Sequence, residues 1–301
     1  MSTFYIKNDN QCYPVTSAEL AARDAKSQHY RKIVDNILDE QEDFPPLKAI
    51  LVKTESMLYQ EDFLNPLCSF AFKSDDPEEL TVQCRQRGLK VIAALCIAYK
   101  APQPIFASTI KLLDTFMRKD NPRPDEIECA AISSFCLQTK IIKDEKFAAH
   151  LRHVPNVSVN DVLSMESLIR SAVKLEKNPI LSSLDFIQVF YTLFQCTATQ
   201  LGLLEFFDQH INIKLLEKVL VSIIVNQEIF EIPSSEQAIM AMLMQLQEGA
   251  QKAGDPELTE KFQAFIHYAS YFGQITETSA YEAFAWIKNT LSNIEMHCKT
   301  F

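Results

Sequence analysis

Glycine is scarce in this chain, with five among 301 residues. Average proteins contain about 7% glycine. Strand-rich folds and phosphate-binding loops depend on glycine for tight turns and for close approach of the backbone to a ligand. Long stretches that lack both glycine and proline favour helices instead, because these two residues are the poorest helix formers. The sequence therefore predicts an all-α fold.

Prolines stand at the ends of segments whose apolar residues recur at helical spacing. Several segments begin with capping residues. In Asp76-Pro77-Glu78-Glu79, for example, an acceptor precedes a proline and two carboxylates. We predict two sets of five helices. The first set covers 77–100, 104–118, 124–139, 144–151 and 159–177. The second set covers 183–201, 213–227, 235–248, 257–272 and 280–294.

Each set is long enough to form its own core, so the chain is predicted to contain two tandem five-helix domains. The predicted division is 1–76 for a tail with flanking helices, 77–179 for the first domain and 180–301 for the second. Within the first segment, residues 1–16 are expected to be a loose tail, and 17–40 and 46–60 are expected to be helices.

The composition argues against several classes of function. The net charge is −10, and no run of lysine or arginine suggests a nucleic-acid surface. The eight cysteines form no CxxC pair, and the longest apolar run, 91–99, is too short to cross a bilayer. We therefore expect the protein to reside in the nucleus, the cytoplasm or both, without membrane or nucleic-acid partners. No motif of an enzyme, a metal site or a cofactor site is present, so we predict a non-enzymatic protein without a cofactor.

Four charged residues interrupt apolar helical surroundings: Arg87, Asp114, Lys140 and Glu166. Most charges in such a chain lie on solvated helix faces. A charge that faces an apolar surface is costly unless it is paired, so each of these four is expected to have a partner or a function.

Three stretches of the chain together resemble the cyclin family. QRGLKVIAAL resembles the start of the cyclin box, which opens with a pattern close to MRAIL. The stretch from KLLDTFM to CLQTK is similar to the family's next two helices, and SMESLIRSAVKLEKNPILSSLDFI is similar to the segment that joins its two lobes. The resemblance spans about residues 80 to 195 and leans towards the A, B and E types of cell-cycle cyclin.

The resemblance implies a role for each of the four charges. Arg87 and Asp114 fall on the family's internal ion pair, and Lys140 and Glu166 fall on the pair that faces the kinase. The implied function is that of a regulatory subunit, which binds a cyclin-dependent protein kinase and positions the kinase helix whose Glu pairs with the ATP-site Lys. Cell-cycle control is the process that this type of cyclin implies.

The surface with which cyclins bind substrates and inhibitors of the kinase is expected to be degenerate in this chain. Its predicted residues are Gln86, Leu89, Lys90 and Ala93. A lysine and small residues replace its apolar wall, and Ala93 stands where cell-cycle members place a Trp. Aromatic anchors contribute much of the energy of peptide binding, so docking of substrates or inhibitors is expected to be weakened. Gly88 inside the first box helix costs about 1 kcal/mol relative to Ala.

Two other functions remain open at this point. The cyclin fold also resembles general transcription factors and pocket proteins, and the chain could instead be a helical adaptor that activates no kinase. The helix at 17–40 has two interpretations as well, a structural brace on the second lobe or a brace that also touches the kinase.

Overall fold

The computed structural model describes residues 5–8, 11–14, 45–64, 77–120, 122–151, 157–176, 179–225, 233–254 and 258. The chain forms two compact units by its internal contacts. One comprises Leu51–Thr192 and Asn212–Met242, and the other comprises Met1–Ile50, Leu193–Ile211 and Leu243–Phe301. This division is made on contacts alone, and the predicted domain boundary at 179/180 stays a prediction.

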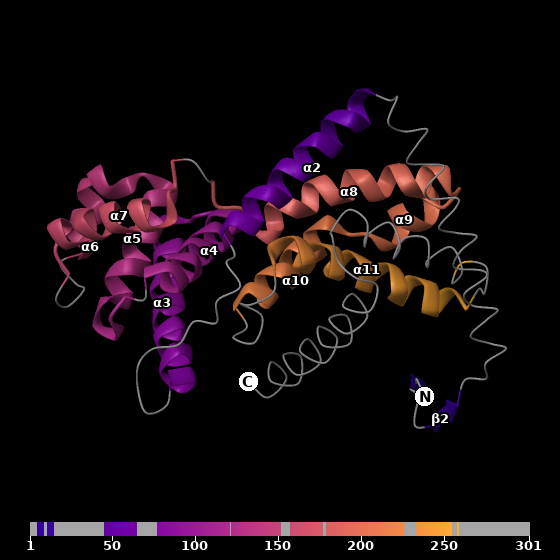
Figure 1. Ribbon diagram of the computed structural model, residues 1–301, viewed down its shortest axis with the longest axis horizontal. Helices are drawn as coiled ribbons and strands as arrows, with labels where there is room; N and C mark the ends of the chain where they lie inside the picture. The colour runs from indigo at the N-terminus through magenta and orange to yellow at the C-terminus, as the bar shows by residue number, and fades with distance from the viewer. Residues whose placement is uncertain are drawn as a thin grey trace. The chain divides into compact units, whose positions relative to one another are not determined.

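The described residues are overwhelmingly helical, which confirms the all-α prediction (Figure 1). The helices of the first predicted set are α3 (Pro77–Tyr99), α4 (Gln103–Asp120), η1 (Pro124–Glu126), α5 (Ile127–Thr139), η2 (Ile141–Lys143), α6 (Glu145–Leu151) and α7 (Val159–Val173). The others are α2 (Pro45–Leu64), α8 (Ser183–Gln200), α9 (Leu204–His210), α10 (Ile213–Val225) and α11 (Ser234–Ala253). The predicted helices at 17–40, 257–272 and 280–294 lie outside the described residues, apart from the single helical residue 258.

Two differences from the predicted elements have simple causes. Within the expected tail, β1 (Tyr5–Asn8) and β2 (Gln11–Pro14) pair as an antiparallel hairpin. Tyr5, Ile6 and Tyr13 are residue types that favour strands, a signal too short to detect beside a long helical pattern. Helix α9 was not predicted, because seven residues are too few to show a helical period.

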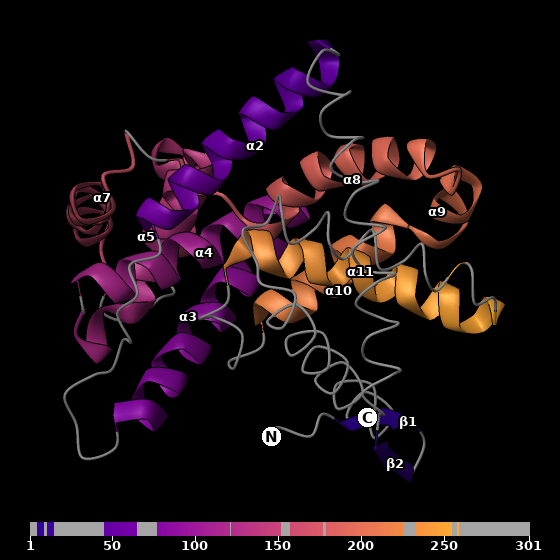
Figure 2. The same ribbon diagram turned by 45° about the vertical axis from the view of Figure 1, so that its right-hand side comes forward.

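In the larger unit, α3, α4, α5 and α7 pack against one another, as Figures 1 and 2 show. Helix α5 is buried on every side, since all of its residues from 130 to 137 are buried, and the other three helices cover it. The fully buried side chains of this core include Ile92 of α3, Leu113 and Phe116 of α4, Phe135 of α5 and Ile169 of α7. This packing fixes the positions of the charged residues described below.

Gly88 lies where α3 approaches α4 and α5 most closely. A Cβ at this position would stand 2.6 Å from Leu113 Cδ2 and 3.4 Å from Ile127 Cγ2. The absence of a side chain therefore allows the helices to pack, and this contact offsets the cost of glycine within a helix.

The smaller unit contains a similar approach between α9 and α11. A Cβ at Gly249 would stand 2.2 Å from His210 Cδ2, so the imidazole ring lies directly over the glycine. His210 Nδ1 is 2.9 Å from the Phe206 carbonyl oxygen, and the rings of Phe206 and His210 lie 4.4 Å apart. Both contacts orient the imidazole ring for this packing.

No helix in the described ranges is long and apolar enough to cross a membrane.

Candidate partner-binding site

Asp114 forms a buried ion pair with Arg85, and the predicted pairing with Arg87 is wrong. Arg85 Nε donates to Asp114 Oδ1 at 2.9 Å, and Nη2 donates to Oδ2 at 3.0 Å. Only 3% of the Arg85 side chain and 8% of the Asp114 side chain are exposed. This bidentate geometry matches the planar guanidinium to the carboxylate and joins α3 to α4.

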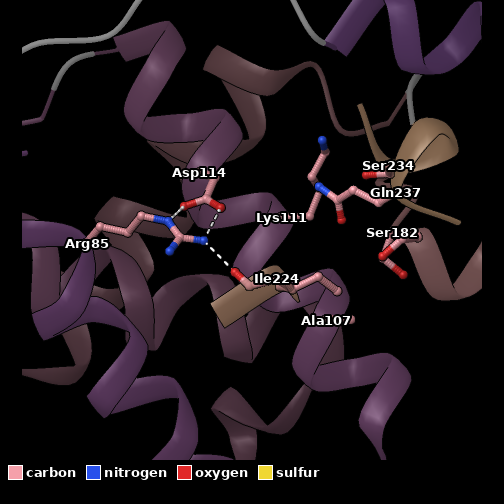
Figure 3. A pocket seen from close by; sticks show the side chains of 9 residues that line it. Arg85, Ala107, Lys111, Asp114, Ser182, Ile224, Ser234 and Gln237 are labelled. Atoms are coloured by element: carbon pink, nitrogen blue, oxygen red, sulfur yellow. Dashed lines mark hydrogen bonds and ion pairs between the residues drawn. The ribbon is translucent and has the colours of Figure 1, made fainter. Parts of the chain in front are cut away.

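The same guanidinium also binds the end of α10. Arg85 Nη2 donates to the Ile224 carbonyl at 2.7 Å (Figure 3). Arg85 Nη1 donates to the Val225 carbonyl at 3.4 Å. The last carbonyls of a helix lack partners within it and carry partial negative charge, which a cation stabilises. Arg85 therefore holds three helices together.

Arg87 makes a different pair at the surface. Its Nε and Nη2 donate to Glu128 Oε1 at 3.3 and 3.1 Å, and both side chains are more than a third exposed. Two residues along a helix are separated by about 200°, so Arg85 and Arg87 face opposite sides of α3. Arg85 is in phase with the buried Leu89 and Ile92, and this spacing could have identified it from the sequence.

The predicted docking residues differ in their exposure. Leu89 is 7% exposed and belongs to the core, Ala93 is half-buried, and Gln86 and Lys90 are exposed.

Glu61 of α2 is a structural residue that the sequence analysis missed. It is 3% exposed, and its carboxylate accepts hydrogen bonds from the backbone N–H groups of Ser234 and Ser235, in the first turn of α11. A carboxylate at this position satisfies free N–H groups and complements the helix dipole. Because Glu61 lies 173 residues from Ser234, no local pattern could indicate this contact.

A cavity of about 20 Å³ lies between these two polar contacts. Its lining includes Arg85, Lys111, Asp114 and Ser182 (Figure 3). Burial lowers the pKa of Lys111, and the nearby Glu61 carboxylate opposes that shift. A cavity of this size accommodates about one water molecule, so it is no candidate cofactor site.

Lys140 forms the C-terminal cap of α5 in a left-handed conformation, with φ 59° and ψ 24°. Its backbone N–H donates to the Cys136 carbonyl at 2.7 Å, and the residue is exposed. Glycine usually occupies such a cap because it adopts positive φ without steric cost. The side chain of Lys140 has no ion pair or hydrogen bond within the described part of the chain.

Glu166 lies on α7, which packs against α5. The residue is 8% exposed, and its Oε1 atom is buried without a hydrogen-bond partner. Burial raises the pKa of Glu166, and the positive charge of Arg170 on the same helix opposes this shift. Glu166 and Lys140 do not form an ion pair with each other among the described contacts.

Within the described part of the chain, the two predicted charges therefore form no ion pair with each other, and Glu166 keeps one oxygen without a hydrogen bond. An exposed apolar side chain lies beside Glu166 on α7, since Leu163, three residues earlier on the same face, is 43% exposed. An acceptor, a donor and apolar surface together can bind a protein partner, because each group gains an interaction that the isolated chain does not supply.

Within the described residues, no cluster of three His, Cys, Asp or Glu side chains could hold a metal ion. The cysteines at 84, 96, 129, 136 and 196 are free thiols. Burial raises the pKa of each thiol, in the case of Cys96 to about 11. Since the thiolate is the reactive form, these cysteines are packing residues.

The comparisons with known proteins bear on the family. No family model matches the chain. Cyclin G of Drosophila melanogaster is 23% identical over 205 residues, which is 64% of this chain and 36% of that protein. The chain thus matches about a third of the length of this curated relative. Together with the all-α fold, the match supports a relationship to the cyclin family.

Proposed function

We propose that the chain is a cyclin-like regulatory subunit that binds and activates a cyclin-dependent protein kinase in the control of the cell cycle. In this proposal the protein has no catalytic site of its own and acts in the nucleus, the cytoplasm or both. The similarity to Cyclin G supports the regulatory class. The side chains of Lys140 and Glu166 support a partner at the α5–α7 surface.

The observation that carries the proposal is the unsatisfied carboxylate oxygen of Glu166. A buried acceptor without a partner costs about 1–3 kcal/mol, and more when it is charged. Native proteins contain few such atoms, and each needs an explanation. A partner that donates a hydrogen bond to Glu166 would recover this cost in the complex.

Lys140 supplies a second indication that a partner binds at this surface. A residue other than glycine in the left-handed region costs about 1–2 kcal/mol. Lys100 and Lys174 share this conformation, so the indication lies in the exposed Lys140 side chain, which has no ion pair or hydrogen bond within the described part of the chain. In our proposal the Lys140 ammonium binds backbone carbonyls of the kinase, and Glu166 binds its backbone N–H groups. These contacts hold the regulatory helix of the kinase inward, where its Glu reaches the ATP-site Lys.

The proposal is tested with a panel of purified cyclin-dependent kinases, measuring affinity by calorimetry and activity by phosphate transfer to a peptide. The test variants are Lys140→Ala and Glu166→Gln. Lys174→Ala is a matched control, because Lys174 is an exposed left-handed cap at the end of α7. Glu128→Gln controls for the loss of a carboxylate.

We expect at least one kinase to bind and to gain activity, and we expect each test variant to weaken that complex at least tenfold. The control variants should bind as the unmodified protein does. If no kinase of the panel binds, the chain is an adaptor or a cyclin-fold protein of another kind. If the controls weaken binding as much as the test variants do, the partner binds elsewhere.

A further inference from the structure

The Glu166 carboxyl group is a titratable group at a predicted interface, and its two oxygens have unequal surroundings. The residue is 8% exposed, whereas Oε1 is fully buried and accepts no hydrogen bond. A carboxylate in such a place is disfavoured relative to the neutral acid, because water no longer solvates its charge. The free protein therefore gains stability when Glu166 holds a proton.

The neighbouring charges do little to offset this effect. On α7 itself the guanidinium of Arg170 acts on Glu166, and it favours the charged form. From α5 the thiol of Cys136 interacts with Glu166, and the carboxylate raises the pKa of that thiol. Lys140, at the end of α5, forms no ion pair with Glu166.

Helix α4 also packs on α7, and two of its charged residues, Lys111 and Lys119, interact with groups other than Glu166. Lys119 lies close enough to Lys174 for the charge of Lys174 to lower the pKa of Lys119. Lys174 is eight residues beyond Glu166, or about 12 Å along the helix. Lys111 of the same helix interacts with Glu61, Arg118 and Asp114. Desolvation is thus the main influence on the pKa of Glu166 in the free protein.

We propose that the partner binds only the ionised form of Glu166, so that formation of the complex releases one proton from this carboxyl group. This inference rests on the proposed function, since it concerns the same surface. N–H donors from the partner favour the charged carboxylate, whereas a protonated carboxyl offers them a weaker acceptor. The affinity of the complex then depends on pH through a single group.

The direction of the dependence follows from linkage. In the free protein burial raises the pKa of Glu166, and in the complex the donated hydrogen bonds lower it. Between these two values, binding expels a proton, so affinity rises with pH. One proton corresponds to a change of at most about tenfold in Kd per pH unit. Above the pKa that Glu166 has in the free protein, the affinity reaches a plateau.

The experiment uses the full chain and the kinase that the panel selects. The Kd is measured from about pH 5 to about pH 8 for the unmodified protein, for Glu166→Gln and for Glu128→Gln. Titration in two buffers of different ionisation enthalpy gives the number of protons released. Glu128 is a suitable control because it is half-exposed and paired with Arg87 at the surface of the same unit.

We expect the unmodified protein and Glu128→Gln to lose affinity as the pH falls and to release up to one proton. Glu166→Gln should bind more weakly and should lack this component of the pH dependence. If that variant binds too weakly to measure, the carboxyl carbon resonance of Glu166 is titrated in the free protein and in the complex, where its pKa should fall on binding.

Equal pH slopes for the unmodified protein and Glu166→Gln, or an unchanged pKa in the complex, would overturn the proton coupling and leave the proposed function intact. Absence of binding at every pH would overturn both. If Glu128→Gln also abolishes the pH dependence of the Kd, the released proton does not belong to Glu166 alone, and the inference is refuted.

Discussion

Replacement of Arg85 by methionine tests the most consequential correction that the structure makes to the sequence. Methionine keeps much of the length and apolar volume of the arginine stem but removes the guanidinium. Asp114, with 8% of its side chain exposed, then loses both hydrogen bonds from its partner. The carbonyl of Ile224 loses its 2.7 Å contact in the same step.

The magnitude follows from burial. Removal of one partner from a buried ion pair costs about 3–5 kcal/mol, because an uncompensated charge remains in a poorly solvated place. In a domain of about 150–250 residues each kcal/mol lowers Tm by about 2–4 °C. Arg85→Met should therefore melt about 6–20 °C below the unmodified protein. Arg87→Met removes an exposed pair worth at most about 1 kcal/mol and should change Tm little.

The assay is thermal unfolding followed by circular dichroism, with urea unfolding as a second measure of the free energy. Arg85→Met combined with Asp114→Leu should recover much of the loss, because neither charge then remains buried alone. If Arg87→Met melts as early as Arg85→Met, the assignment of the buried pair is wrong. A loss below about 1 kcal/mol for Arg85→Met would show that Asp114 is solvated.

Three further predictions concern single residues. Gly88→Ala should lose up to about 2 kcal/mol in urea unfolding, because its Cβ would stand 2.6 Å from Leu113 Cδ2 and the cost of overpacking, about 1–3 kcal/mol, offsets the gain of about 1 kcal/mol in helix propensity. A gain of about 1 kcal/mol would contradict this packing. Glu61→Gln should lower the free energy of unfolding by about 1–2 kcal/mol, because the cap of α11 is weakened. The weakened cap should appear as faster amide exchange in the first turn of α11, and unchanged exchange would exclude the capping role. Lys140→Gly should raise the free energy of unfolding by about 1 kcal/mol and should weaken kinase binding. Lys174→Gly should raise stability in the same way without changing kinase binding. Full kinase binding by Lys140→Gly would refute the role of that lysine.

Much of the fold could be predicted because the signals were local. The start of α3 at Pro77 and that of α7 after Ser158 were marked by capping residues, and the observed helices begin at or directly after them. Ser158 and Asp161 form a capping box through reciprocal hydrogen bonds, a sequence pattern that marks the start of a helix. Scarcity of glycine, proline at segment ends and apolar spacing act within a few residues, so they need no knowledge of tertiary contacts.

The candidate site was harder to predict because its properties depend on packing between distant segments. Lys140 and Glu166 were selected as charges in apolar surroundings, and the structure shows one exposed and the other buried. The sequence could not indicate that they leave each other unpaired, since this depends on how α5 and α7 pack. The contact of Glu61 with α11 was undetectable for the same reason.

The choice between Arg85 and Arg87 could have been made from the sequence, because the spacing of the apolar residues in α3 shows which arginine shares their face of the helix. The buried positions Cys84, Leu89 and Ile92 define one face of the helix, and Arg85 falls on it, whereas Arg87 does not. Matching of motif letters favoured the wrong arginine because it ignored this face. The buried face of α3 joins α4 and α10 through Arg85, whereas Arg87 on the opposite face pairs with Glu128 at the surface.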